Sequence, residues 1–395
     1  MAISMNLLLF VVGAGIVQSI FLASLIYFHP KSDRSVNSFL ALFIVSLTIP
    51  MLVPILQYYY SWQVLLFLDP FLLLTAPLLY LYVRSFKETL NWKKVWPHFI
   101  LFLIFVAFDY HLFVDIASKY PPSQQVPPEM IYNPSSILRV VVRISQMITY
   151  YLLASRVLTS YQRSIMHLFS ETSNIDLNWV RWLINGYLIL VLAMVVFYVA
   201  ILKNPEQFSL MVLLNTAVVT PFIYAVTFKG VTQPTLWQVQ KGISKETVLQ
   251  EIHDAEESEL APPEGEGRNI KDTLGPERRA LILDRIISLM ETDKLYLRPE
   301  LTLQDLADKL EVPYYQVSVS INEGLHKTFY DLVNGYRVEE AKRLLMDPKN
   351  RSNKILAVAF DAGFNSKTTF NTVFKKLTGI TPTEYKEQQQ PMLEV

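Results

Sequence analysis

The chain contains no cysteine, and this absence excludes disulfide bonds, thiolate metal sites and cysteine nucleophiles. Glycine is scarce, with 12 among 395 residues. The sequence has no glycine-rich nucleotide loop, no HExxH motif and no nucleophile–base pair. Its six histidines are scattered, without the spacing of metal ligands. We therefore expect no enzyme activity, no metal site and no cofactor.

Charge is scarce in residues 1–229, which are overwhelmingly apolar and aromatic, and most of the charge follows them. The totals balance, with 35 Lys and Arg against 35 Asp and Glu. This uneven placement indicates that two parts of the chain face two solvents, lipid and water. At 395 residues the chain also exceeds one ordinary domain of roughly 100–200 residues. The sequence thus predicts a membrane part followed by a water-exposed part.

Seven apolar runs in the first part are long enough to cross a bilayer, which takes roughly 20 residues each. They lie near 6–28, 39–58, 65–83, 97–114, 137–155, 182–202 and 208–228. The first run lacks a basic flank and exceeds the apolar core of a signal peptide, so we expect a retained helix.

Basic residues in the loops predict the orientation of these runs, because cytoplasmic loops carry an excess of Lys and Arg. The loops after the first, third and fifth runs hold Lys31, Arg34, Arg84, Lys87, Lys93, Lys94, Arg156, Arg163 and Arg181. The other loops hold far fewer, chiefly Lys119 and Lys203. We therefore expect the N-terminus outside and the C-terminal part in the cytoplasm.

Four charged residues lie in or beside the predicted spans: Asp69, Asp109, Arg139 and Arg143. Charges inside a membrane are costly and are often functional. Arg139 and Arg143 are four residues apart and share one helical face, where an anionic ligand could approach. In the alternative interpretation, Arg139 snorkels to the interface and Arg143 pairs with Asp69 or Asp109 for packing. The sequence leaves both open and names no small-molecule or protein signal.

Residues 230–275 are polar and acidic, with nine acids against four bases. Pro262 and Pro263 discourage regular structure there. As a flexible coil, such a segment would span roughly 35–40 Å from end to end. We interpret it as an acidic flexible linker.

Residues 352–386 predict two short helices joined by a tight turn, followed by the start of a third. Gly363 supplies the left-handed residue that ends the first helix, and Ser366 offers an N-cap for the second. The segment from Thr381 to Glu384 is a capping box. The buried stripe of the second helix is predicted to be Phe370, Val373, Phe374 and Leu377. Its other face is polar and basic, as a reader of the major groove must be.

This segment resembles the second helix-turn-helix of AraC/XylS-type transcription regulators, as in membrane-bound bacterial members of that family. The residues that carry the resemblance are Ala359, Gly363, Phe364, Ser366, Phe370, Phe374, Lys375, Lys376, Gly379, Thr381, Pro382, Tyr385 and Lys386. The resemblance implies a first helix-turn-helix upstream and a long helix, FYDLVNGYRVEEAKRLL at 329–345, that joins the two. It also implies double-stranded DNA as a partner.

The two predicted reading helices differ in charge. The second offers Lys367, Thr368, Thr369, Asn371, Thr372, Lys375 and Lys376 for DNA contact. The first offers Tyr314, Tyr315, Gln316, Ser318 and Ser320. It has no Lys or Arg, and Pro313 stands where a capping serine is usual in the family. We expect the first helix to contribute less affinity than the second.

The expected fold is all-α. A seven-helix transmembrane bundle at 1–229 and the linker at 230–275 precede a cytoplasmic all-α domain at 276–390, with helix-turn-helix units at 301–325 and 352–378. The expected function is that of a transcription regulator in the inner membrane of a bacterium, contacting the lipid bilayer and binding DNA, with a homodimer doubling the contacts. The alternative is a transporter or channel with an appended helical regulatory domain.

Overall fold

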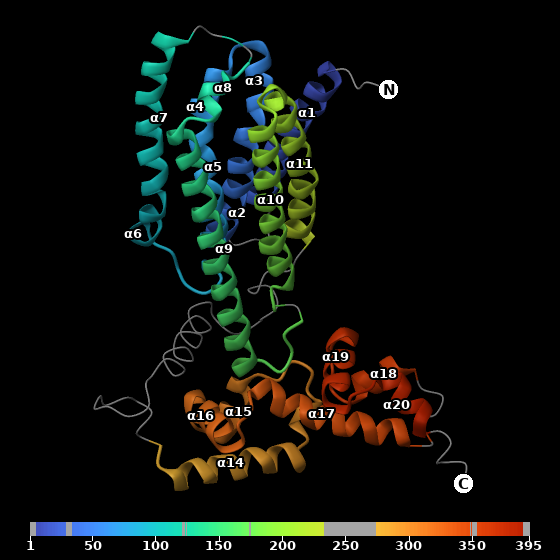
Figure 1. The fold of residues 1–395 in the computed structure, drawn as a ribbon. Coiled ribbons are helices and arrows are strands. Elements are labelled where there is room, and N and C mark those ends of the chain that lie inside the picture. The colour runs from blue at the N-terminus through green and yellow to red at the C-terminus, as the bar shows by residue number, and fades with distance from the viewer. Residues whose placement is uncertain are drawn as a thin grey trace. The chain divides into compact units, whose positions relative to one another are not determined.

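The computed structural model describes residues 5–28, 34–120, 123, 125–173, 175–232, 274–347, 349 and 354–389. Most of the predicted linker, at 233–273, lies outside these residues. The chain separates into two compact units (Figure 1). The first unit is Met1–Thr159 with Leu177–Gln238, and the second is Ser160–Asp176 with Val239–Val395. The second unit therefore includes a short segment from the middle of the apolar region, which the sequence did not predict.

Helices make up both units, and the described residues contain no β-strand beyond one isolated bridge between Phe169 and Thr302. The helices of the first unit are α1 (Met5–Phe28), α2 (Arg34–Thr48), α3 (Val53–Tyr59), α4 (Leu65–Leu68), α5 (Leu72–Arg84), α6 (Trp92–Val95), α7 (Ile100–Lys119), α8 (Pro128–Ile131), α9 (Pro134–Leu168), α10 (Asn178–Lys203) and α11 (Phe208–Thr232). The last residues of α9, from Ser160 on, belong to the second unit.

Proline residues divide two of the predicted spans into shorter pieces. Pro50 and Pro54 lie at the starts of a 3-10 turn, Ile49–Leu52, and of α3. Pro70 starts another 3-10 turn between α4 and α5. Proline lacks the backbone N–H that an inner helical position donates, but it is tolerated in the first turn, so each proline begins a new helical piece.

Six helical segments among the described residues are long and apolar enough to cross a membrane. They are Arg34–Tyr59, Trp62–Arg84, Trp92–Ile116, Pro134–Leu168, Asn178–Lys203 and Pro205–Gly230. The predicted first span lies in α1, of which the stretch Val12–Phe28 is apolar but shorter. The count of seven spans is therefore not confirmed, because six segments qualify among the described residues and α1 is not one of them.

Many large apolar side chains of the first unit point outward. Leu103, Ile104 and Phe108 on α7 are all exposed, and so are Ile189, Leu192 and Val196 on α10. Exposed apolar surfaces of this extent are rare on soluble proteins. The surface of these helices suits lipid better than water.

The second unit contains seven helices within its described C-terminal part (Figure 1). They are α14 (Pro276–Glu291), α15 (Leu303–Leu310), α16 (Tyr314–Leu325), α17 (Phe329–Met346), α18 (Ile355–Asp361), α19 (Lys367–Thr378) and α20 (Pro382–Gln389). The helix α17 packs against α16 as well as against α18, α19 and α20. It forms the common support of two helix-turn-helix units, as the sequence predicted.

Candidate nucleic-acid interface

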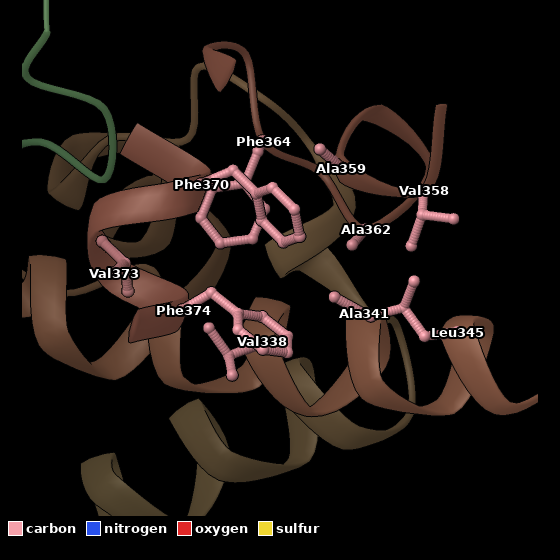
Figure 2. Close-up of a cluster of buried hydrophobic side chains, with 10 residues drawn as sticks. All are labelled: Val338, Ala341, Leu345, Val358, Ala359, Ala362, Phe364, Phe370, Val373 and Phe374. Atoms are coloured by element: carbon pink, nitrogen blue, oxygen red, sulfur yellow. The ribbon is translucent and has the colours of Figure 1, made fainter. Parts of the chain in front are cut away.

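An aromatic core holds the second helix-turn-helix together. Phe364, Phe370 and Phe374 are fully buried, and their rings contact one another in series at steep angles, with centroids 5.0 and 5.5 Å apart. Figure 2 shows these rings beside Val338 and Ala341 of α17. Burying a phenylalanine side chain contributes about 1.5–3 kcal/mol. This core fixes the position of α19 on α17.

The turn between α18 and α19 requires glycine. Gly363 has a φ of +89°, which disfavours residues with a side chain. A Cβ at this position would lie 2.5 Å from the carbonyl oxygen of Tyr296. The sequence prediction of a left-handed glycine here is confirmed.

Hydrogen bonds at the ends define α19. The Ser366 side chain accepts a hydrogen bond from the Thr369 backbone N–H at 3.4 Å, and Gly379, with a φ of +83°, ends the helix. At the next helix, the Thr381 N–H donates to Glu384 Oε2 at 2.7 Å, and these contacts with Thr381 lower the pKa of Glu384. Both predicted caps are present.

The outer face of α19 carries most of the side chains predicted for DNA contact. Lys367, Thr368, Thr372, Lys375 and Lys376 are exposed, and Asn371 is half-buried. Four of them, Asn371, Thr372, Lys375 and Lys376, line an open depression together with the first residues of α20, Thr381–Thr383. Lysines and hydroxyl groups gathered in this way suit the binding of phosphate groups.

Two expectations for α19 require correction. Leu377 was predicted to belong to the buried stripe but is 51% exposed, because the stripe ends at Phe374. Thr369 was predicted to face DNA but is buried, and its hydroxyl donates a hydrogen bond to Glu171 Oε1 at 2.9 Å. The spacing of three residues from Ser366 places Thr369 on the packed side of the first turn.

The first helix-turn-helix has a regular start and a less polar surface. The Thr302 side chain accepts from the Asp305 N–H at 3.1 Å, and Asp305 Oδ2 accepts from the Thr302 N–H at 2.8 Å, forming a capping box for α15. The residue before α16 is Pro313, which provides no side-chain cap. Val317 and Ile321 are buried, as predicted.

Only part of the predicted DNA-contact set on α16 reaches the surface. Tyr314, Tyr315 and Ser318 are partly exposed. Gln316 and Ser320 are buried, and the Ser320 hydroxyl donates to the Gln316 carbonyl oxygen at 2.7 Å. These two side chains follow the inward face set by Val317 and Ile321, so their predicted position on the DNA-facing surface is wrong.

Comparison with known proteins agrees with this geometry. The family model described as "Helix-turn-helix domain", which is of the AraC type, matches residues 306–388. The C-terminal region is an AraC-type helix-turn-helix head.

A curated protein supports the same assignment. It is an uncharacterised helix-turn-helix-type transcriptional regulator from the region 5′ of cgkA in Pseudoalteromonas carrageenovora, 34% identical over 61 residues. The match covers 15% of this chain and about a third (34%) of that relative. No solved structure matches the chain. The matches support a DNA-binding transcription regulator with an AraC-type head.

The loop after α9 packs into the AraC-type head. Phe169 and Ser170 are buried, and the Ser170 hydroxyl donates to the Leu301 carbonyl oxygen at 2.6 Å. The Asn334 side-chain amide donates to the Ser170 carbonyl oxygen at 2.9 Å. Glu171, the next residue, reaches Thr369 on α19. One short loop thus contacts α17, the start of α15 and the second reading helix.

Arg337 of α17 connects this loop to the rest of the AraC-type head. It is fully buried, and its guanidinium donates to the carbonyl oxygens of Tyr296 and Arg298, each at 2.7 Å. It also donates to the Ser170 carbonyl oxygen at 3.3 Å and the Ser170 hydroxyl at 3.2 Å. Burial lowers the pKa of Arg337 to about 10, so it stays protonated at neutral pH. Sequence reasoning missed this residue, because the helical pattern does not indicate that Arg337 is buried among backbone carbonyl oxygens of distant residues.

The four charged residues of the membrane part form two pairs. Arg139 donates to Asp109 at 2.8 Å, and Arg143 donates to Asp69. Arg143 is buried, and its pairing with Asp69 matches the packing alternative. Arg139 pairs as well, with Asp109. Ligand binding by this group is taken up below.

Proposed function

We propose that the chain is a membrane-tethered transcription regulator. Its AraC-type head would bind double-stranded DNA at specific sequences, under the control of a signal sensed by the membrane part. The observation that carries this proposal is the exposed basic face of α19 within the matched domain. Six apolar helices long enough to cross a membrane support the tethering.

In this proposal the exposed side chains of α19 divide into two roles. Lys367, Lys375 and Lys376 would neutralise phosphates and set the register on the duplex. Thr368 and Asn371 lie one turn apart on the same helix, and they would reach base edges in the major groove. The charge of Lys376 is already shared with Asp331, 3.1 Å away. We therefore expect Lys367 and Lys375 to contribute more than Lys376.

The first reading helix would add recognition by shape. Tyr314, Tyr315 and Ser318 on α16 offer hydroxyl groups and aromatic edges without positive charge. Since α17 packs against helices of both helix-turn-helix motifs, the two reading helices would enter successive major grooves. A homodimer would double these contacts and raise the effective concentration of the second head.

The loop after α9 offers a route for control. Glu171 places a carboxylate against the first turn of α19, on Thr369. The first turn of a recognition helix is where the N–H groups and hydroxyls of DNA-binding proteins hold a phosphate. Glu171 would therefore add negative charge beside the first turn of α19 and disfavour the approach of a DNA phosphate there. Because α9 is continuous from Pro134 to Leu168, a movement of its membrane part would displace Phe169–Glu171.

Cytoplasmic placement of the head follows from the same proposal. The excess of Lys and Arg in the loops after the first, third and fifth apolar runs favours an external N-terminus. A reporter that is active only in the cytoplasm, fused to the C-terminus, tests this point and should be active. Activity of a reporter specific for the outer side would contradict the proposal.

Genome-wide crosslinking of the intact protein in its bacterial host tests the function directly. We expect a small set of enriched sites that share a sequence, and loss of those sites when Lys367 and Lys375 are both replaced by alanine. Equal enrichment across the genome would contradict sequence-specific regulation. Substrate flux into vesicles that contain the full chain would favour the transporter alternative instead.

A further inference from the structure

The membrane unit contains a partly open cavity of about 270 Å³. Its walls come from the segments around α2–α5, from α8 and α9, and from α10 and α11. Small-molecule sites usually measure roughly 300–1,000 Å³, so this cavity lies just below that range and suits a small ligand. Most of the wall is apolar, as at Leu66, Met194 and Phe197. A site with such walls favours a small molecule with an apolar body.

The polar part of the wall contains hydrogen-bond donors that lack an acceptor. Within the described residues, four lining side chains have a buried polar atom without a partner: Trp62 Nε1, Arg139 Nε, Arg143 Nε and Tyr198 Oη. Three of these atoms can only donate, and the tyrosine hydroxyl can donate as well. A buried polar group left without a partner costs about 1–3 kcal/mol. An acceptor placed among them would remove part of that cost.

The arrangement of the two ion pairs leaves these donors available. Asp69 and Asp109 each accept from a terminal nitrogen of an arginine, which fixes both guanidinium groups and leaves each Nε–H free. Arg143 is only 7% exposed, so its free donor cannot be satisfied by bulk water. Arg139 and Arg143 lie one turn apart on α9, and Tyr198 lies close enough to interact electrostatically with both.

From these observations, we propose that the cavity is a binding site for a small amphipathic molecule whose apolar body carries a carbonyl or carboxylate head. The apolar wall receives the body, and the donors of Arg139, Arg143 and Tyr198 receive the acceptor head. The binding site itself does not depend on DNA binding. Its role as the sensor of the signal rests on the function proposed above.

Tryptophan quenching in the full chain, reconstituted in nanodiscs, tests the site. Trp62 lines the cavity, whereas Trp92 is exposed at the start of α6. We use 10-bromodecanoic acid, because bromine quenches tryptophan fluorescence on contact. We expect saturable quenching that disappears in Trp62→Phe and persists in Trp92→Phe. Quenching that rises without saturation and is equal in both variants would overturn the proposal.

Two further variants test the head group and the cavity separately. Tyr198→Phe removes one hydroxyl and is expected to weaken bromodecanoate binding about threefold to tenfold, the equivalent of one neutral hydrogen bond. Binding of 1-bromodecane, which lacks the acceptor, should not change in this variant. Val212→Phe fills part of the cavity and should weaken both probes. Equal effects of Tyr198→Phe on both probes would overturn the assignment of the head group.

The same chemistry could come from a bilayer lipid, whose acyl ester also has an apolar body and a carbonyl head. Nanodiscs made with a brominated phospholipid distinguish the sources. If decanoic acid relieves the quenching of Trp62 by the brominated lipid, the result supports a free molecule as the occupant. If decanoic acid does not relieve it, a free molecule is overturned as the occupant.

The outcome is separable from that of the proposed function. Saturable binding without any change in DNA affinity would leave the site intact and contradict control by the membrane part. Sequence-specific DNA binding without saturable quenching would contradict the binding site and leave the proposed DNA-binding function intact.

Discussion

The two helix-turn-helix units of the head share one supporting helix and differ in how they face solvent. The reading helix α19 begins with a serine cap and exposes Lys367, Lys375 and Lys376. The reading helix α16 begins after Pro313, which provides no side-chain cap, and contains no Lys or Arg. Both bury an apolar stripe, formed by Val317 and Ile321 in α16 and by three residues in α19.

In the proposed function, this difference separates the residues that hold the fold from those that would hold DNA. The buried stripe of α19 packs on α17, and α16 packs against α14 and α15 as well as α17. Electrostatic attraction to phosphates supplies much of the affinity for DNA. We infer that α19 provides most of the affinity together with the base contacts, and that α16 adds recognition by shape. The predictions below test this division.

The largest expected effect comes from a change in α17, the helix that supports both helix-turn-helix motifs. Replacing Arg337 with leucine removes the guanidinium that donates to the carbonyl oxygens of Tyr296, Arg298 and Ser170. We expect the head to lose about 3 kcal/mol or more of unfolding free energy. Hydrogen exchange of the full chain should show faster exchange in both α16 and α19.

The matched control for that change is Arg343→Leu. Arg343 lies on the same helix but is exposed and pairs with Glu340, three residues away. An exposed pair contributes about 0–1 kcal/mol, so little change is expected. Faster exchange in only one of α16 and α19 after Arg337→Leu would contradict the role of α17 as their shared support.

The next effect concerns DNA affinity. Replacing Lys367, Lys375 and Lys376 together with alanine should weaken binding roughly a hundredfold at moderate salt and lower the salt slope by about 3. Fluorescence anisotropy of a labelled duplex with the full chain measures both quantities. A change of Tyr315 to alanine on α16 should weaken binding less and leave the salt slope unchanged. Equal slopes in all variants would remove the distinction between the two helices.

A smaller effect in the opposite direction is expected at the loop contact. Glu171→Gln keeps the shape of the side chain but removes the charge that faces α19. If Glu171 competes with a DNA phosphate, affinity should rise about tenfold, because charge-assisted contacts are worth roughly 1.5–3 kcal/mol. Glu300→Gln removes the same charge from an exposed position and should have little effect. Weaker DNA binding by Glu171→Gln would show that Glu171 assists α19.

The smallest expected effect is on stability, and it distinguishes the N-terminal caps of α19 and α16. Ser366→Ala removes the hydroxyl that accepts from the Thr369 N–H, and loss of an N-cap costs about 1 kcal/mol. Pro313→Ala removes no cap hydrogen bond and should change the stability of α16 by less than that. Urea unfolding followed by hydrogen exchange in each helix provides the comparison. A greater loss in α16 would contradict the role of the serine cap.

Local chemistry made much of the head predictable from the sequence. Gly363, the caps at Ser366 and Thr302, and the buried Phe370 and Phe374 depend on residues only a few positions apart. Each such feature has a signal in helical spacing or in cap composition.

The features that the sequence did not reveal depend on contacts between distant residues. Glu171 and Thr369 are 198 positions apart, and Arg337 and Ser170 are 167 apart. Helical periodicity carries no information on such pairs. The burial of Gln316, Ser320 and Thr369 was missed for a related reason, since each polar side chain donates a hydrogen bond inside the head. The membrane cavity likewise arises only when several helices assemble.

The central claim is that α19 of the full chain binds DNA at specific sequences through its basic face. The most direct measurement is selection of duplexes from a random pool by the full chain in nanodiscs, repeated with Lys367 and Lys375 replaced by alanine. We expect the unaltered chain to enrich one shared sequence and the variant to enrich none at the same salt concentration. Equal enrichment by both proteins, or none by the unaltered chain, would contradict the claim.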